Sequence, residues 1–270
     1  MDRFDHHWRL GAVALLCAAA LSACGGSDEP ATTTSAGTTP AADTTATTSP
    51  TTTESPATTT ESPAATTEDL PDNGFAGQSA NNILAAARTS AQQALSVHVI
   101  GEVDDTSFDI TFVRDEGSVG SVTVGDTSFE IIAAGDRFFM RGDDAFYEEI
   151  GGASLAELIG DRWLAGPVDD PQFSGVAALA NVDRLLEESL DPSGGIEKGE
   201  ATEVDGRPAI ALVSDEGTLD VATTGTPLPL RITAQDDRGV MTFEGWDEEF
   251  EIPIPGESID VSELQRGATK

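Results

Sequence analysis

The sequence predicts an α+β protein with one long, strongly curved antiparallel sheet whose helices gather on one face. Two groups of short β-branched and aromatic runs carry this prediction, one over residues 96–142 and one over residues 195–246. Asp- and Gly-rich turns separate the runs, so consecutive strands should pair as hairpins. Helical patterns precede the first group and lie between the two groups, an order typical of α+β folds.

The first element is an amphipathic helix in the stretch "SANNILAAARTSAQQALS", with Ser79 as its N-cap. Its apolar residues recur at helical spacing and define one face rather than a membrane span. These residues are Ile83, Leu84, Ala87, Ala91 and Leu95.

The strands of the first group are "SVHVIGEV", "SFDITFVR", "SVGSVTVG" and "TSFEIIAAGDRFFMRG". The second group has evenly spaced turn signals at 205–206, 215–217 and 237–239. Between the groups, "SLAELIGDRWLAG" and "FSGVAALANVDRLLEESL" predict a mostly non-strand region. The second segment places Val176, Leu179, Val182, Leu185 and Leu186 on one helical face.

Residues 1–23 predict a lipoprotein signal peptide. The apolar run from Leu10 to Ala23 is shorter than the roughly 20 residues that cross a bilayer, and Arg3 and Arg9 precede it. It ends in Leu-Ser-Ala-Cys, which resembles the bacterial lipobox, so Cys24 should carry a diacylglycerol and become the first residue of the mature chain. An ordinary secretory signal is the alternative, but it would leave an exported thiol without a disulfide partner.

Residues 24–74 predict a lipidated N-terminus and a disordered linker rich in Thr, Pro and Ser. No aromatic or large aliphatic residue occurs between Pro30 and Asp69, so the segment cannot bury enough apolar surface to fold. About 45 such residues span roughly 35 to 40 Å. The linker is either bare or O-glycosylated on its threonines. Residues 75–270 then form one domain.

The charge excludes one class of function. The chain has 14 Lys and Arg against 48 Asp and Glu, with a formal net charge of −34. Nucleic-acid binding needs a basic face, which such a chain does not offer. Carboxylates should also be repelled by anionic lipid headgroups, so a spacer between the anchor and the domain is useful. The scarcity of lysine is typical of a GC-rich genome and suggests an actinobacterium.

Catalytic chemistry is not expected, and we expect no catalytic residue, no cofactor and no metal site. His98 is the one histidine left after signal removal, and it lies in a strand, so no catalytic triad can be built without it. Acidic pairs are frequent enough to arise by chance in turns. A specific calcium site is the less favoured interpretation, because the ligand spacing of an EF-hand is missing.

The order of several segments resembles actinobacterial lipoproteins of the LppX/LprG type and, more distantly, LolA/LolB carriers. These segments are "GDRFFMRG…AFYEEI", "DRWL", "KGEATEVDGRPAIALV", "LDVATTGTPLPLRI" and "GVMTFEGWDEEFEIPIP". The resemblance covers residues 79–255. It implies a half-barrel with helices on its concave face and an apolar cavity that holds the acyl chains of a lipid or lipoglycan.

Alternating apolar positions should line this cavity, although helices that fill the sheet face completely are the alternative. The predicted lipid contacts are Phe108, Ile110, Phe112, Trp163, Leu230 and Phe243. The predicted function is a lipid-binding or lipid-carrying lipoprotein, anchored through Cys24 to the outer face of the cell membrane. The alternative is a non-catalytic lipoprotein that recruits an envelope protein partner.

Overall fold

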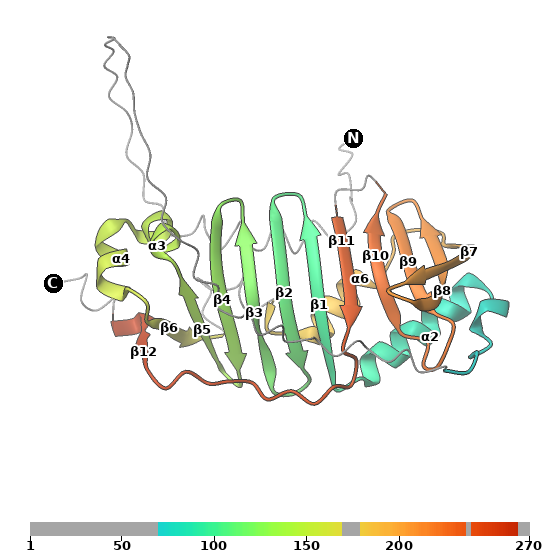
Figure 1. Ribbon diagram of the computed structural model, residues 1–270, viewed down its shortest axis with the longest axis horizontal. Helices are drawn as coiled ribbons and strands as arrows, with labels where there is room; N and C mark the ends of the chain where they lie inside the picture. Colours follow the sequence, from blue (N-terminus) through green and yellow to red (C-terminus); the bar gives the residue numbers. More distant parts are fainter. Residues whose placement is uncertain (1–69, 169–178, 236–238, 264–270) are drawn as a thin grey trace, which may run out of the picture. The chain divides into compact units, whose positions relative to one another are not determined.

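The computed structural model describes residues 70–168, 179–235 and 239–263. Twelve strands form one sheet in the order β12-β6-β5-β4-β3-β2-β1-β11-β10-β9-β8-β7 (Figure 1). The helical elements are η1 (Phe75–Gly77), α2 (Ala80–Gln93), α3 (Asp144–Gly151), α4 (Ala153–Ile159) and α6 (Val182–Ser189). The strands are β1 (Ser96–Val103), β2 (Thr106–Val113), β3 (Gly117–Val124), β4 (Thr127–Ala134), β5 (Arg137–Gly142), β6 (Trp163–Pro167), β7 (Glu197–Val204), β8 (Arg207–Ser214), β9 (Gly217–Ala222), β10 (Pro229–Ala234), β11 (Gly239–Glu244) and β12 (Ser258–Asp260).

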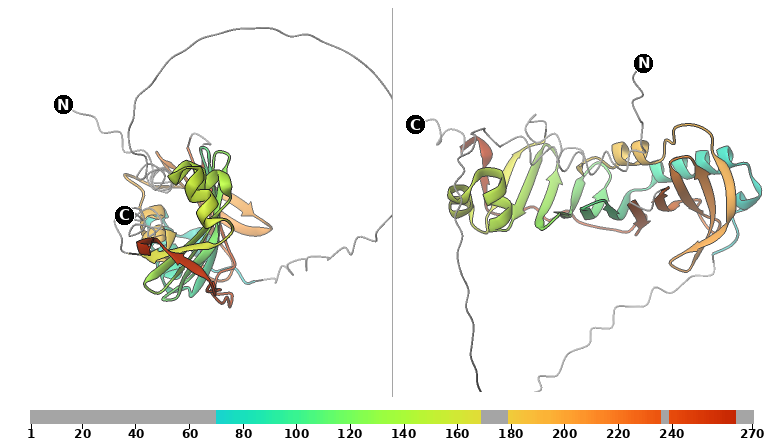
Figure 2. Two further views of the ribbon diagram at one scale, coloured as in Figure 1. Left: turned by 90° about the vertical axis from the view of Figure 1, so that its left-hand side faces the viewer. Right: turned by 90° about the horizontal axis from the view of Figure 1, so that it is seen from above.

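The sheet consists of two antiparallel meanders that meet side by side. Strands β1 to β6 form one meander and β7 to β11 form the other, and β1 pairs with β11 where the two meanders join. The sheet is curved and does not close, and β12 and β7 lie at its edges (Figure 2). The predicted fold class, an α+β half-barrel, is confirmed. The short strand β12 adds a parallel pairing, with β6, which the hairpin pattern did not predict.

The two faces of the sheet differ in what covers them. We call the covered face the one that carries Phe108, Ile110 and Phe112 of β2, because these residues share one apolar cluster with the described helices. The helix residues in this cluster are Ala80, Ile83, Leu84, Ala87 and Ala91 of α2, Phe146 and Tyr147 of α3, Ala156 and Ile159 of α4, and Val182, Leu185 and Leu186 of α6. We call the other side, which carries Ser107 and Asp109, the open face.

Local sequence explains where the helices begin and end. The Ser79 hydroxyl accepts a hydrogen bond from the Asn82 amide at 3.4 Å and caps α2, as predicted. Helix α2 ends at Gln93, so Leu95 lies beyond it and is exposed. Helix α3 and strand β6 were not predicted as separate elements, and Val176 lies outside the described residues.

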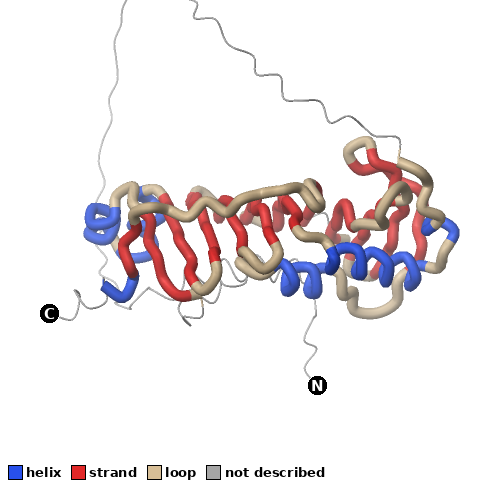
Figure 3. Tube along the Cα trace, turned by 90° about the horizontal axis from the view of Figure 1, so that it is seen from below, coloured by secondary structure: helices blue, strands red, loops and turns tan. Residues whose placement is uncertain are grey.

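A strap, residues 245–257, crosses the open face from the end of β11 to β12 (Figure 3). Its first part is fixed where Trp246 stacks on Phe243 and its indole N–H donates to the Pro229 carbonyl at 3.2 Å. Further along, Ile252 packs against a small cluster on the open face that contains Ile132 and Phe139. The strap therefore starts at the apolar cluster of the covered face and covers only the part of the open face around Ile132 and Phe139.

The N-terminal segment of the described fold is tied to the second meander. The Asn73 amide donates to the Thr223 carbonyl at 2.9 Å, and its side chain donates to Ala222 at 3.0 Å. Lys198 of β7 donates to the Ala76 carbonyl at 3.0 Å. These bonds fix the position at which the chain enters the domain.

Candidate functional site

Four of the six predicted lipid contacts lie together on the covered face. Phe108, Ile110 and Phe112 alternate along β2, and Phe243 belongs to the neighbouring strand pair β1–β11. Their exposed fractions are 4%, 1%, 2% and 2%, and all four belong to the apolar cluster that the helices share. Strand pairing alone brings them together, because side chains two residues apart point to the same face of a sheet.

Leu230 lies elsewhere because a β-bulge interrupts its strand. The pairing of β10 with β9 shifts register between Pro229 and Arg231, and the extra residue reverses the alternation. Leu230 is buried in a separate cluster with Val204, Ala209 and Ala222. The apolar side chains expected along one face therefore include Ile232 but not Leu230. We call the strand side chains of the covered-face cluster the apolar row.

Trp163 also lies away from the other predicted contacts, because it starts β6 and faces the open side. Its ring packs against the cluster of Ile132, Phe139 and Ala165. The Arg141 guanidinium lies over the ring, 4.7 Å from the centroid, and the Arg141 Nε donates to Glu130 at 2.7 Å. The indole is therefore engaged by a cation and by the cluster that Ile252 of the strap also joins.

Helix α6 covers part of the apolar row. It buries Val182, Leu185, Leu186 and Ser189. The Asn181 side chain caps its first turn by accepting from the Arg184 amide at 3.0 Å, but a helix of eight residues is too short to be stable alone. Packing on the sheet must therefore hold this helix in place.

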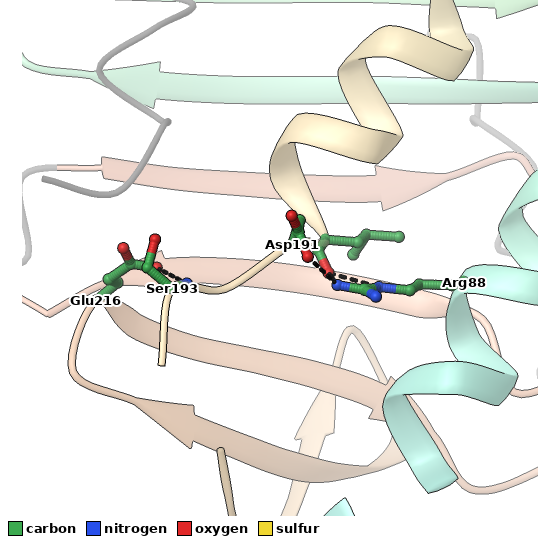
Figure 4. A network of polar contacts seen from close by, with 5 residues as sticks. Arg88, Asp191, Ser193 and Glu216 are labelled. Atoms are coloured by element: carbon green, nitrogen blue, oxygen red, sulfur yellow. Dashed lines mark hydrogen bonds and ion pairs between the residues drawn. The ribbon is translucent and has the colours of Figure 1, made fainter. Parts of the chain in front are cut away.

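Two arginines fasten α6 at its ends. At the C-terminal end, Arg88 of α2 donates through Nε to the Leu190 carbonyl at 2.8 Å and pairs with Asp191 at 2.8 Å (Figure 4). The loop that follows is tied by the Ser193 amide, which donates to Glu216 at 3.0 Å. At the N-terminal end, Arg114 pairs with Asp183. We call Arg88 and Arg114 the latches.

Arg114 also connects the sheet to the end of α2. Its Nε donates to the Ala94 carbonyl at 2.8 Å and its Nη2 donates to the Ala91 carbonyl at 3.1 Å. A guanidinium can make several such bonds at once because its donors lie in one rigid plane. Sequence reasoning missed both latches, since nothing in the spacing of Arg88 or Arg114 distinguishes them from other surface arginines.

The space left beneath the end of α6 is small in this conformation. A cavity of about 10 Å³ lies there, whereas ligand pockets usually measure about 300 to 1,000 Å³. Its lining comprises Leu84, Ser189, Leu190, Pro192, Ile196, Leu212, Ser214 and Leu219. At this place an acyl chain could enter only if α6 moved.

Two buried polar side chains of the covered face have backbone partners. The Tyr147 hydroxyl accepts from the Gly142 amide at 3.1 Å, and burial raises the pKa of this phenol, so it stays protonated at neutral pH. The Ser118 hydroxyl donates to the Leu179 carbonyl at 2.9 Å. These contacts satisfy polar groups within an otherwise apolar face.

His98 lies on the open face, between two carboxylates. Its ring nitrogens are 2.7 Å from Asp109 and 3.0 Å from Glu244. Within the described ranges, no group of three or more His, Cys, Asp and Glu residues is arranged to hold a metal ion.

The predicted signal peptide, Cys24 and the predicted linker up to residue 69 lie outside the described residues. Residues 70–74 of the predicted linker are described, and Asn73 among them donates to the Thr223 and Ala222 carbonyls. Among the residues that the structure does describe, no helix is long and apolar enough to span a membrane.

Comparison with known proteins finds similarity in solved structures alone. No protein-family model matches the chain, and no curated protein matches it significantly. The crystal structure of LprF from Mycobacterium bovis matches with 15% identity and a TM-score of 0.48, covering 66% of this chain and 97% of LprF. The lipoprotein LppX from Mycobacterium tuberculosis matches with 16% identity and a TM-score of 0.40, covering 64% of this chain and 99% of LppX. LppX, whose type was named above from the order of sequence segments, is thus among the solved structures that are similar to this chain.

A third match is the crystal structure of MucB. Its identity with this chain is 16% and its TM-score is 0.30, and the match covers 69% of this chain and 62% of MucB.

Proposed function

We propose that this chain is a lipid-anchored lipoprotein of the cell envelope, without catalytic activity, that binds the acyl chains of a lipid or lipoglycan between its sheet and α6. One observation carries the proposal: a short helix, fastened by a latch at each end, covers a continuous row of large apolar side chains. In the proposal, the conformation described above is the closed one. Displacement of α6 opens the row to ligand.

A comparison of burial free energies sets the length of the acyl chain that could replace α6. Lifting the helix exposes Val182, Leu185 and Leu186, which are worth about 1.5 to 3 kcal/mol each. A buried methylene contributes about 0.8 kcal/mol, so roughly 6 to 11 methylenes offset the loss. The proposal therefore predicts that long acyl chains bind and that short ones do not.

The test uses residues 25–270, exported behind a signal peptide without a lipobox and purified without detergent. Native mass spectrometry followed by lipid extraction should find a stoichiometric acylated adduct. The lipid-free protein should take up a palmitoyl lipid but not an octanoyl lipid with the same headgroup. An apo mass with no uptake of either lipid would refute acyl-chain binding.

The anchor is tested separately, because it depends on Cys24 rather than on the sheet. Cys24→Ala should abolish metabolic labelling with a fatty acid, while Cys17→Ala, in the segment removed with the signal, should keep it. A diacylglycerol supplies two chains, which is enough for stable anchoring on the outer face of the membrane. Labelling that persists in Cys24→Ala would refute the lipidation site.

We also propose a second candidate function, the recruitment of an envelope protein. The net charge of −34 supports a basic partner. Opposite charges raise the rate of association and favour binding to a surface of complementary charge. A pull-down from an envelope extract should capture a basic protein at low salt and release it at high salt. The absence of any basic protein at low salt would argue against this function.

A further inference from the structure

The open face carries a long groove that the lipid-binding proposal does not use. One hollow of about 390 Å³ lies over β11, β1, β2 and β3. Another of about 540 Å³ lies over β2 to β6 beside the strap. The two hollows share Asp109 and Ser121, so they adjoin. We call them together the outer groove.

Large apolar side chains are exposed along the outer groove. Ile100 and Val240 line the first hollow and are 40% and 38% exposed, and Ile254 of the strap lines the second and is 67% exposed. Phe250, also on the strap, is 43% exposed. Apolar side chains that gather in one hollow of a polar surface are typical of a place where a partner binds.

The charge of the outer groove selects among possible partners. Glu102, Asp109 and Glu130 line it, and the one arginine in the lining, Arg141, is already paired with Glu130. The strap also carries two exposed acids, Glu249 and Glu251. A cationic partner is therefore favoured.

The same charges disfavour two other occupants. A second copy of the chain carries the same net charge of −34 and would be repelled at close range. Anionic lipid headgroups would be repelled for the same reason. The positions of the acids are fixed, because His98 holds Asp109 and Arg141 holds Glu130.

We propose that the outer groove binds a basic polypeptide segment with large apolar side chains, contributed by an envelope partner. Its cationic side chains pair with Glu102, Asp109 and the acids of the strap. Its apolar side chains pack on Ile100, Val240 and Ile254. This inference rests on the second proposed function and is independent of acyl-chain binding.

The test measures binding of synthetic peptides to residues 25–270 by fluorescence anisotropy. The probe alternates Arg and Leu, one control peptide alternates Arg and Ser at the same charge, and another alternates Glu and Leu. The Arg-Leu peptide should bind about tenfold more tightly than the Arg-Ser peptide, and the Glu-Leu peptide should not bind. Binding should weaken at about 1 M salt, where the Debye length is about 3 Å.

Variants locate the binding surface. The double variant Ile100→Ser with Ile254→Ser should weaken binding of the Arg-Leu peptide about tenfold. The separate variant Glu102→Gln should weaken it about threefold. Matched controls are Leu158→Ser on α4, where Leu158 is 53% exposed, and Glu200→Gln on the edge strand β7. These two controls should leave the affinity unchanged.

Two results would overturn the inference in distinguishable ways. If the Arg-Leu peptide binds but the groove variants and the control variants lower its affinity equally, the outer groove is not the binding site. Recruitment of a basic partner would then still stand. If no basic peptide binds at low salt, both the inference and the second function fail. Binding of a neutral oligosaccharide in competition with the Arg-Leu peptide would instead assign the groove to a glycan and overturn the inference.

Discussion

The covered face and the open face belong to the same strands, yet they are built differently. Strand β2 alternates in the usual way, with Phe108 and Ile110 towards the helices and Ser107 and Asp109 on the open face. In β4, by contrast, neighbouring residues on both faces are buried, because the strap places Ile252 on Ile132. A segment without regular structure can therefore decide which part of a sheet face is core and which part stays exposed.

The largest expected effect is a difference in the free energy of unfolding between substitutions on the two faces. Phe112→Ala should lower the free energy of unfolding by about 3 to 5 kcal/mol, because Phe112 is buried in the apolar cluster that the sheet shares with the helices. Ile100→Ala on the open face should cost less than about 1 kcal/mol. Urea unfolding of both variants measures the difference. Equal losses would show that the open face is also part of the core.

The second prediction tests how closely the covered face is packed. A Cβ added at Gly101 would lie 2.1 Å from Cζ of Phe108, whose ring lies across this glycine. Gly101→Ala should therefore displace the ring and lower stability by about 1 to 3 kcal/mol. Gly256→Ala in the strap, where the added Cβ would meet nothing within 4 Å, should be close to neutral. A neutral Gly101→Ala would mean that Phe108 moves freely.

The third prediction concerns the latches. Arg88→Gln removes the pairing with Asp191 and weakens the bonds to Leu190, which together are worth about 1 kcal/mol. Amide exchange over residues 182–189 should then be about fivefold faster, while β2 stays protected. Arg184→Gln is the matched control, because Arg184 pairs with Glu188 within α6 itself. Equal acceleration in both variants would show that Arg88 does not fasten the helix.

The smallest effect depends on pH at the edge of the sheet. Hydrogen bonds from Ser262, and then from Arg137, lower the pKa of Asp260 at the end of β12. The carboxylate therefore adds stability at neutral pH, and this contribution is lost as the pH falls through the lowered pKa, below about 4. Asp260→Asn should cost about 0.5 kcal/mol at pH 7 and almost nothing near pH 3. A difference from wild type that grows towards pH 3 would contradict this sign.

Local signals predicted much of the fold because they act over a few residues. Ser79 caps α2 as expected, and the turn at Asp205 and Gly206 joins β7 to β8 with positive φ angles of 50° and 81°. Helix α6 follows the spacing of Val182, Leu185 and Leu186. Each of these features depends on the chemistry of neighbouring residues.

The features that escaped prediction depend on long-range contacts. The bulge beside Leu230 depends on how β10 meets β9, and β12 becomes a strand because β6 offers it a free edge. The contact of Arg88 with Leu190 joins residues 102 positions apart. The predicted lipid contacts Leu230 and Trp163 therefore lie away from the other four for reasons that periodicity does not contain.

The junction of β1 with β11 has a consequence for the order in which the chain can fold. In the pairing of β1 with β11, His98 lies opposite Glu244, 146 residues later. The β1 edge of the first meander therefore stays unpaired until the end of the second meander has been synthesised. Such distant pairing slows folding, and a waiting strand edge invites aggregation. If the chain is exported as proposed, its N-terminal part arrives first, and the nascent domain should need a chaperone until β11 has followed.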